Sequence, residues 1–238
     1  MAFAMGVNVL LPRHPCFNKT YVSINGRQKS KNHFSDLFWH RDKIGGHTIP
    51  VGRDHQTLVR NVIRELLFVS PQEARRAEEN TLVIHIRSGD IFRSQTPHPS
   101  YIMPPLCFYV HIIEKSGTRV DKIHLVAEDT LNPCVNLLRK RYPNVVFKIS
   151  SLAEDVKTII RARKIVFGTG TFVPQLLTFF NDSLTEIYRA SNASEPSLGG
   201  YSCKDNVIDI SDYISKIGSW KNTPAQRQLM CDYEFPEV

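Results

Sequence analysis

A regular alternation of short apolar runs and longer amphipathic segments constrains the fold more than any other feature of this chain. The runs predict strands over residues 82–86, 122–127, 145–149, 165–167 and 184–188. The segments between them predict helices over 106–115, 132–142, 152–163 and 171–180, with Ser151 as the N-cap of the third. Strands that alternate with helices pair in parallel. The sequence therefore predicts an α/β fold, a Rossmann-like parallel sheet with flanking helices.

The two ends of the chain have weaker patterns. A strand is expected over residues 7–11, and apolar residues at helical spacing predict a helix over 54–68. Residues 191–238 are rich in Ser, Asn, Gly and Pro. They predict a short helix around 210–217 and otherwise loops that pack back or are partly disordered.

The charge balance favours an anionic partner. The chain has 30 Lys and Arg against 23 Asp and Glu, a net charge of +7. Its basic clusters, at 139–141 and 161–164, fall on predicted helices and are expected to be solvated helix faces. Without zinc-finger or RNA-binding motifs, nucleic acid is not the expected anionic partner.

The cysteines give no metal signature, because no Cys-x-x-Cys pair is present. Cys107 and Cys134 fall in apolar helical patterns and are expected in the core. Cys203 and Cys231 could pair in an oxidising compartment.

Sequence triplets of the N-glycosylation type occur at Asn18, Asn181 and Asn192, and they favour the secretory pathway. Residues 1–12 are apolar but resemble neither a signal peptide nor a membrane span. A luminal protein would then depend on an anchor outside this chain.

The first candidate site follows the strand over 82–86. This strand delivers His85, Arg87 and Asp90 to its carboxyl end, where open α/β sheets bind their ligands. The planar guanidinium of arginine suits phosphate recognition. The alternative is a strand with a polar end followed by a Gly-Asp turn.

The second candidate site is the Gly168-Thr-Gly-Thr-Phe172 segment between a strand and a helix. Gly170 would let the backbone approach a ligand, and the N–H groups at the helix N-terminus would attract a phosphate near Thr169 and Thr171. The segment matches neither the P-loop nor the dinucleotide-binding fingerprint. The alternative is an ordinary capped turn, with Thr171 as the N-cap.

Acidic residues supply the remaining candidates. Glu128 and Asp129 follow the strand over 122–127 and could accept hydrogen bonds from ribose or guanine, although Asp129 could equally cap the next helix. Asp155 could bind the base or complement the helix dipole. A D-x-D metal signature is absent, and no metal ion is expected.

The loop with His98, Tyr101, Pro104 and Pro105 has the most unusual composition. It suits stacking against an acceptor sugar, and it suits plain packing equally well. We assign it no chemical task from the sequence.

The His85-Ile-Arg-Ser-Gly-Asp90 segment resembles a motif of the GDP-fucose-dependent fucosyltransferases, the α1,2-, α1,6- and protein O-fucosyltransferase superfamily. The segment from Ser151 to Phe172 is similar to the distal motif of that superfamily. The resemblance covers residues 80–189. At the position of Ser88 many members carry a second arginine, and the family's N-terminal Gly-x-x-Gly-Asn segment is not found.

This resemblance implies a GT-B-like fold with an incomplete N-terminal lobe over 1–78, a nucleotide-sugar-binding domain over 79–190 and a tail over 191–238. It implies inverting, metal-independent transfer of fucose from GDP-fucose to a hydroxyl of a glycan or glycoprotein, in the Golgi or ER lumen. Arg87 is the expected catalytic residue. The expected donor-binding residues are His85, Asp90, Glu128, Asp129, Asp155, Thr169, Gly170, Thr171 and Phe172.

Two alternatives stay open. A fucosyltransferase-like module could bind glycan or nucleotide without turnover, or the transferase could use another sugar-nucleotide donor. Selective binding of guanine nucleotides favours the GDP-fucose reading, and turnover separates the enzyme from the module.

Overall fold

The computed structural model describes residues 80–115, 120–180, 183–196 and 203–236, and two short strands nearer the N-terminus. The chain divides into two compact units, Met1–Pro71 and Gln72–Val238. In the first unit, β1 (Lys43–Ile44) and β2 (His47–Thr48) form an antiparallel pair. The predicted strand over 7–11 and helix over 54–68 lie outside the described residues.

The second unit is built on a six-stranded sheet in which every pair of neighbouring strands is parallel. Its strands are β3 (Thr81–His85), β4 (Lys122–Val126), β5 (Val145–Phe147), β6 (Lys164–Phe167), β7 (Glu186–Ala190) and β8 (Lys204–Ile208). They lie in the order β5-β4-β3-β6-β7-β8. This is the strand order of Rossmann folds, in which the chain reverses direction across the sheet between the first and fourth strands. The predicted Rossmann-like α/β fold is confirmed, and the switch point lies between β3 and β6.

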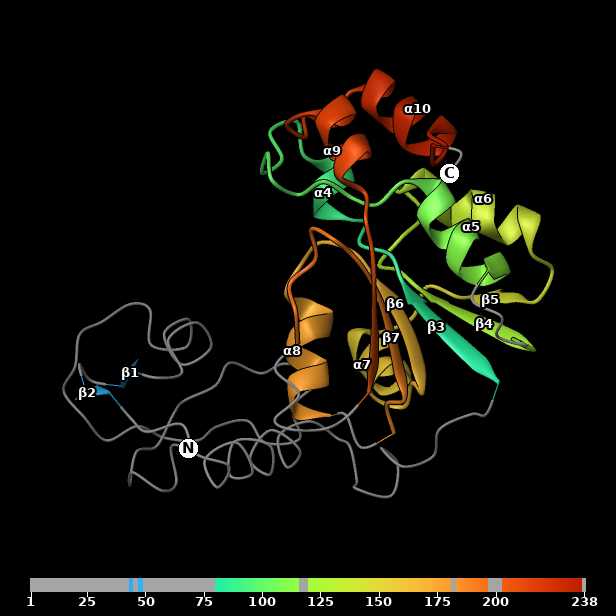
Figure 1. The fold of residues 1–238 in the computed structure, drawn as a ribbon, viewed down its shortest axis with the longest axis vertical. Helices are drawn as coiled ribbons and strands as arrows, with labels where there is room; N and C mark the ends of the chain where they lie inside the picture. Colours follow the sequence, from blue (N-terminus) through green and yellow to red (C-terminus); the bar gives the residue numbers. More distant parts are fainter. Residues whose placement is uncertain are drawn as a thin grey trace. The chain divides into compact units, whose positions relative to one another are not determined.

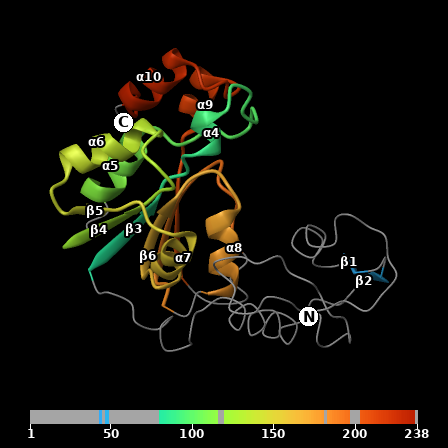
Figure 2. The ribbon, with the colours of Figure 1, turned by 180° about the vertical axis from the view of Figure 1, so that it is seen from behind.

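Helices cover both faces of the sheet (Figures 1 and 2). The helices are α4 (Asp90–Arg93), α5 (Leu106–Lys115), α6 (Pro133–Arg141), α7 (Leu152–Ile160), α8 (Phe172–Phe179), α9 (Ser211–Ile217) and α10 (Pro224–Asp232). Helices α5 and α6 lie on one face, with α10 packed against both, while α7 and α8 lie on the other. Helices α4, α9 and α10 gather beyond the carboxyl ends of the strands (Figure 1). The strand ends therefore meet a layer of helical structure at this edge.

The hydrophobic core divides between the two faces of the sheet. Along β3, Leu82 and Ile84 belong to the cluster under α5 and α6, while Val83 belongs to the cluster under α7 and α8. In β6 the pattern alternates in the same way, with Ile165 on one face and Val166 on the other. Both faces of these strands are buried, which explains why they appear in the sequence as continuous apolar runs.

The predicted strands and helices between residues 81 and 190 are confirmed, with ends shifted by a few residues. The Ser151 side chain caps α7 by accepting from the Glu154 N–H at 3.3 Å, also as predicted. A strand end and a helix start depend on local hydrogen bonding, which an apolar pattern locates only approximately.

The C-terminal segment contains more regular structure than its composition predicts. The helix expected around 210–217 is present as α9, but the prediction of loops elsewhere was wrong for β8 and α10. β8 escaped detection because it is an edge strand whose residues are mostly exposed or half-buried, so it lacks an apolar run. For α10 a signal was present: Thr223 and Gln226 form a capping box, with Pro224 at the first position of the helix.

The cysteines of the described stretches are distributed over both faces of the sheet. Cys134 is buried and Cys107 is half-buried against the same core cluster, as predicted. Cys203 packs against the cluster under α7 and α8, whereas Cys231 lies on α10 on the opposite face. The pairing of Cys203 with Cys231, which an oxidising compartment would have allowed, is not formed: the sheet separates the two residues, and the four cysteines of the described stretches are free thiols.

Of the three glycosylation triplets, only that of Asn192 lies within the described residues. The side-chain nitrogen of Asn192, the atom that would carry a glycan, donates to the Ile102 carbonyl at 3.1 Å. None of the helices in the described stretches is long and apolar enough to cross a membrane.

Candidate anion-binding site

Arg87 lies just beyond the carboxyl end of β3, beside the switch point of the sheet. Its guanidinium carbon lies 4.3 Å from the centre of the Tyr101 ring, in cation–π geometry. One terminal nitrogen donates to the Asp90 carboxylate at 3.3 Å. The Arg87 side chain is 28% exposed and that of Asp90 is 70% exposed, so this ion pair is mostly solvated and weak. The guanidinium keeps donor capacity for a ligand.

The turn between β6 and α8 faces the same guanidinium. Gly170 has a φ of +134°, a conformation that side chains rarely adopt, and a Cβ built there would lie 3.4 Å from the second terminal nitrogen of Arg87. The structure therefore places the arginine directly against the glycine turn that sequence analysis singled out. These two segments are separated by about eighty residues in sequence, and the parallel pairing of β3 with β6 brings them together.

Thr169 and Thr171 play different parts in this turn. The Thr169 hydroxyl donates to the Ile102 carbonyl at 2.7 Å and so fastens the turn to the loop before α5. Thr171 occupies the N-cap position of α8, but its side chain makes no capping hydrogen bond. The alternative interpretation of Thr171 as a capping side chain is therefore wrong. Its hydroxyl and the first N–H groups of α8 are the donors that this end of the helix offers to an anion.

His85 and Phe172 form an aromatic pair next to the turn. Their ring centres lie 5.7 Å apart, with His85 at the end of β3 and Phe172, 37% exposed, at the start of α8. Desolvation by burial, together with the positive charge of Arg87, lowers the pKa of His85 to about 4. The imidazole is therefore neutral near pH 7, and the exposed ring of Phe172 is available for stacking against a ligand.

The low pKa of His85 makes a prediction for stability. Its pKa is depressed in the folded state, so the unfolded chain binds a proton more readily and stability falls as the pH drops from about 6.5 towards 4. We expect this residue to contribute a loss of about 2 kcal/mol between pH 7.5 and pH 5. Urea unfolding of the wild type and His85→Gln at both pH values measures it. An equal pH dependence in the two proteins would contradict the prediction.

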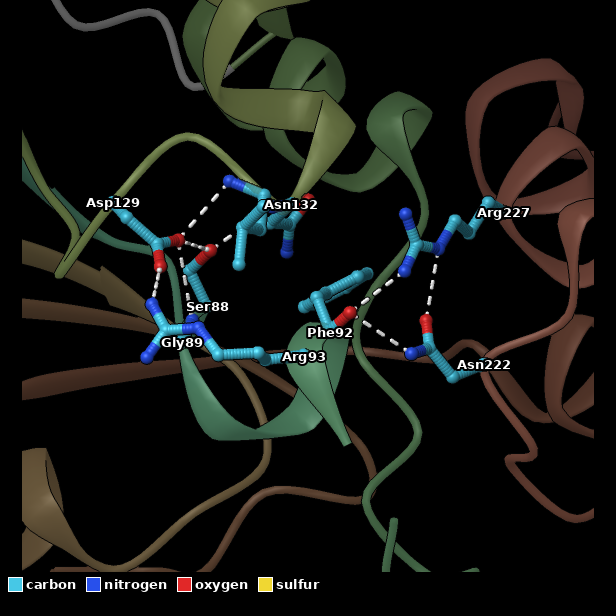
Figure 3. Close-up of polar contacts among 9 residues, drawn as sticks. Ser88, Gly89, Phe92, Arg93, Asp129, Asn132, Asn222 and Arg227 are labelled. Carbon is cyan, nitrogen blue, oxygen red and sulfur yellow. Dashed lines mark hydrogen bonds and ion pairs between the residues drawn. The ribbon is translucent and has the colours of Figure 1, made fainter. Parts of the chain in front are cut away.

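The loop between β4 and α6 forms a hydrogen-bond network with the loop after β3 (Figure 3). Asp129 accepts from the Ser88 hydroxyl, from the Gly89 N–H at 3.2 Å and from the Leu131 N–H at 3.0 Å. Arg93 donates to its other oxygen at 2.9 Å. Partial burial acts to raise the pKa of Asp129. The hydrogen bonds outweigh this effect and hold that pKa below its usual value. The carboxylate is thus engaged within the protein.

Asn132, and not Asp129, is the N-cap of α6. Its side-chain oxygen accepts from the Cys134 N–H at 3.0 Å, and its side-chain nitrogen donates to the Arg87 carbonyl at 3.1 Å. Asn132 is fully buried, and its own N–H donates to Ser88 at 2.9 Å. The capping role proposed for Asp129 is therefore wrong, and the residue that caps the helix also holds the backbone of Arg87.

Glu128 and Asp155 occupy different surroundings. The exposed Glu128 carboxylate packs directly against Gly89, in the space that a side chain at that position would fill. Asp155 lies in the first turn of α7 and accepts from the Ser150 hydroxyl, and burial raises its pKa. Within the described part of the chain, no hydrogen bond or ion pair joins Asp155 to Arg87 or to the Gly168–Phe172 turn.

Sequence reasoning missed a second network that holds α4 from its other side (Figure 3). Asn222 donates to the carbonyls of Phe92 at 2.9 Å and Ser94 at 3.1 Å, and Arg227 donates to the Phe92 carbonyl at 2.7 Å. These donors come from the segment between α9 and α10 and from α10 itself. They lie about 130 residues away in sequence, and no local signal connects them with α4.

The arrangement can bind an anion. A partly exposed guanidinium, a glycine turn and the N-terminus of α8 converge at the switch point, and an exposed aromatic ring lies beside them. Among the described residues, no group of three or more His, Cys, Asp or Glu side chains is placed to hold a metal ion. No family model matches this chain, and no curated protein matches it.

Proposed function

We propose that this protein binds a nucleotide-sugar at the switch point between β3 and β6 and transfers the sugar to a hydroxyl group. The observation that carries the proposal is the placement of Arg87 against Gly170 at the carboxyl ends of two adjacent parallel strands. This edge is where Rossmann-like sheets bind nucleotides. With the resemblance of the two motifs, it supports GDP-fucose as the donor and a GT-B-like arrangement for the whole protein.

The chemistry follows from the charges. As the glycosidic bond breaks, its electron pair leaves with the diphosphate, on which negative charge collects. The acceptor oxygen attacks the sugar from the opposite face, with inversion, and the hydroxyl gives up its proton to a base or to water. A fixed guanidinium and the helix N–H groups stabilise that charge more in the transition state than in the ground state. Arg87 supplies the guanidinium in this scheme, and Gly170 and Thr171 supply the turn. The exposed Phe172 ring would lie against the nucleotide, and no metal ion is required.

The proposed acceptor is a hydroxyl of a glycan or glycoprotein. GDP-fucose donors and such acceptors are encountered in the Golgi or ER lumen, and we propose that compartment for the protein. The same proposal divides the chain into a lobe over residues 1–78, a nucleotide-sugar-binding domain over 79–190 and a tail over 191–238.

A second candidate, a binding module without turnover, is favoured by one specific observation. Asp129, one of the expected site carboxylates, accepts hydrogen bonds from several donors, which lower its pKa and leave it little capacity to take a proton. Asp155, whose pKa is raised, makes no contact with the Arg87 cluster. A transferase needs a base for the acceptor hydroxyl, and these carboxylates do not supply one.

Calorimetric titration with GDP, GDP-fucose, UDP and ADP tests the binding step. Arg87→Ala should lose about 1.5–3 kcal/mol of binding free energy, the value of a charge-assisted contact, or roughly ten- to a hundredfold in affinity. The control is Arg141→Ala, which removes the same charge from an exposed position at the end of α6. Equal affinity of wild type and Arg87→Ala, or no nucleotide binding at all, would contradict the proposal.

Release of GDP from GDP-fucose in the presence of acceptor glycans separates the two candidate functions. Turnover that Arg87→Ala abolishes supports the transferase. Selective guanine-nucleotide binding without turnover supports the binding module. Preference for UDP or ADP would identify a different sugar-nucleotide donor.

A further inference from the structure

The loop over residues 98–105, to which we assigned no chemical task from its composition, lies beside the candidate site and contacts both Arg87 and the Gly168–Phe172 turn. The Ile102 carbonyl accepts from Thr169 after β6 at 2.7 Å and from Asn192 after β7 at 3.1 Å. At Gly168, a side chain would collide with the Pro104 ring, since a Cβ would lie 2.5 Å from it. The loop is therefore fastened to the ends of two neighbouring strands.

The same loop is also held by the C-terminal segment. The Trp220 N–H donates to the Pro99 carbonyl at 2.9 Å, and Trp220 is buried. Attached at both ends in this way, the loop presents Tyr101 at a fixed place beside the end of β3.

Tyr101 covers one face of the Arg87 guanidinium, at 4.3 Å from ring centre to guanidinium carbon. On its own side, the Tyr101 ring packs against His98 at 5.2 Å, and the His98 Nδ1 atom lies 2.7 Å from the Ser100 hydroxyl. Tyr101 thus contacts both Arg87 and His98, whose ring is tilted by 50° against it, and a terminal nitrogen of Arg87 lies beside Gly170. A guanidinium in contact with an aromatic face keeps its in-plane N–H donors free.

The other contact of Arg87 is too weak to orient it alone. The ion pair with Asp90 is long, at 3.3 Å, and Asp90 is 70% exposed. Pairs of this kind contribute little in water. The Tyr101 ring is the better-fixed of the two partners, because its loop accepts hydrogen bonds from Thr169, Asn192 and Trp220.

We propose that Tyr101 is a positioning residue for the anion site: it holds the Arg87 guanidinium with its donor edge towards Gly170 and the N-terminus of α8. This inference rests on the proposed function and deepens it, by assigning the loop over 98–105 to recognition of the diphosphate. A guanidinium ordered before binding loses less conformational freedom when the anion arrives.

The test compares Tyr101→Leu with Tyr101→Phe, using inorganic pyrophosphate and GDP as probes in calorimetry. Tyr101→Leu should weaken both by roughly three- to tenfold, the range of a partly exposed cation–π contact. Tyr101→Phe keeps the aromatic face, so this variant should bind both probes as tightly as the wild type does. Unchanged affinity in Tyr101→Leu would overturn the proposal.

A double-mutant cycle distinguishes positioning from a merely structural role. In the Arg87→Ala background, Tyr101→Leu should cause no further loss of pyrophosphate affinity, because its effect passes through the arginine. An equal loss with and without Arg87 would show that the tyrosine supports the fold only, and it would overturn the inference.

A second readout does not depend on ligand binding. The Arg87 Nε–H signal in a ¹H–¹⁵N NMR spectrum, assigned by its disappearance in Arg87→Ala, should be shifted by the ring current of Tyr101. The shift should persist in Tyr101→Phe and vanish in Tyr101→Leu. If the wild type binds neither probe, the proposed function fails, and this signal alone decides whether Tyr101 positions Arg87. A signal that is the same in all three proteins would overturn the inference.

Discussion

Replacing Trp220 with alanine is expected to lower the free energy of unfolding by about 3–5 kcal/mol, the range for large aromatic side chains removed from a core. Trp220 is 1% exposed and packs edge-to-face on Phe92, with ring centres 5.4 Å apart. Its indole nitrogen also donates to the Ile91 carbonyl at 3.4 Å. The alanine variant would leave a cavity between the C-terminal segment and α4.

Urea unfolding followed by circular dichroism measures this loss without relying on the fluorescence of the removed residue. Trp220→Phe should cost much less, about 1–2 kcal/mol, because it keeps most of the buried area and loses one hydrogen bond. The exposed position Val207, 49% exposed on β8, provides a surface control, where Val207→Ala should stay within about 0.5 kcal/mol. A loss below about 1 kcal/mol for Trp220→Ala would mean that the C-terminal segment does not pack on α4 as described.

Replacing Asn132 with alanine is expected to cost about 2–4 kcal/mol. This variant removes the N-cap of α6, worth about 1 kcal/mol, and leaves the Arg87 carbonyl without its donor, which costs about 1–3 kcal/mol in a buried setting. Asn132 is fully buried, so water cannot replace these hydrogen bonds.

The matched control is Asn136→Ala, on the exposed side of the same helix. There we expect a change within about 0.5 kcal/mol. Chemical denaturation measures the free energy of unfolding of both variants. Equal values would show that the hydrogen bonds of Asn132 to Cys134 and Arg87 do not stabilise the protein.

Nucleotide affinity adds a second measurement to the Asn132 variant. Because Asn132 holds the backbone of Arg87 at 3.1 Å, the variant should also weaken GDP binding under conditions where it stays folded. Trp220→Phe changes a side chain that packs on Phe92 of α4 and, in the described part of the chain, forms no hydrogen bond or ring contact with Arg87. It should therefore reduce the affinity for GDP less than Asn132→Ala does.

The local sequence predicted the elements whose stability depends on local patterns and burial. The apolar run Leu82–Ile84 identified β3 because both faces of that strand are covered. Ser151 identified the start of α7, because a cap hydrogen bond joins residues only three apart. The alternation of such segments was enough to predict a parallel Rossmann-like sheet.

The same reasoning failed for a strand that is not buried on both faces, and for residues whose contacts lie far away in the sequence. β8 lies at the sheet edge and has no apolar pattern, so nothing in its own residues marks it as a strand. Asp129 and Asn132 are both good capping residues three apart, and only the fold shows which one begins α6. Cys203 and Cys231 are both near the C-terminus, yet the sheet lies between them.

The sequence by itself thus determined which residue types could form an anion site: an arginine after one strand and a glycine-rich turn after another. Only the tertiary structure decided that they meet, because strand order follows from packing of the whole sheet and not from any local segment. The support of Arg87 by Tyr101, and of α4 by Asn222 and Arg227, was likewise decided by the fold. Contacts between residues far apart in sequence form only when the whole core packs. The local propensity of a segment therefore cannot predict them.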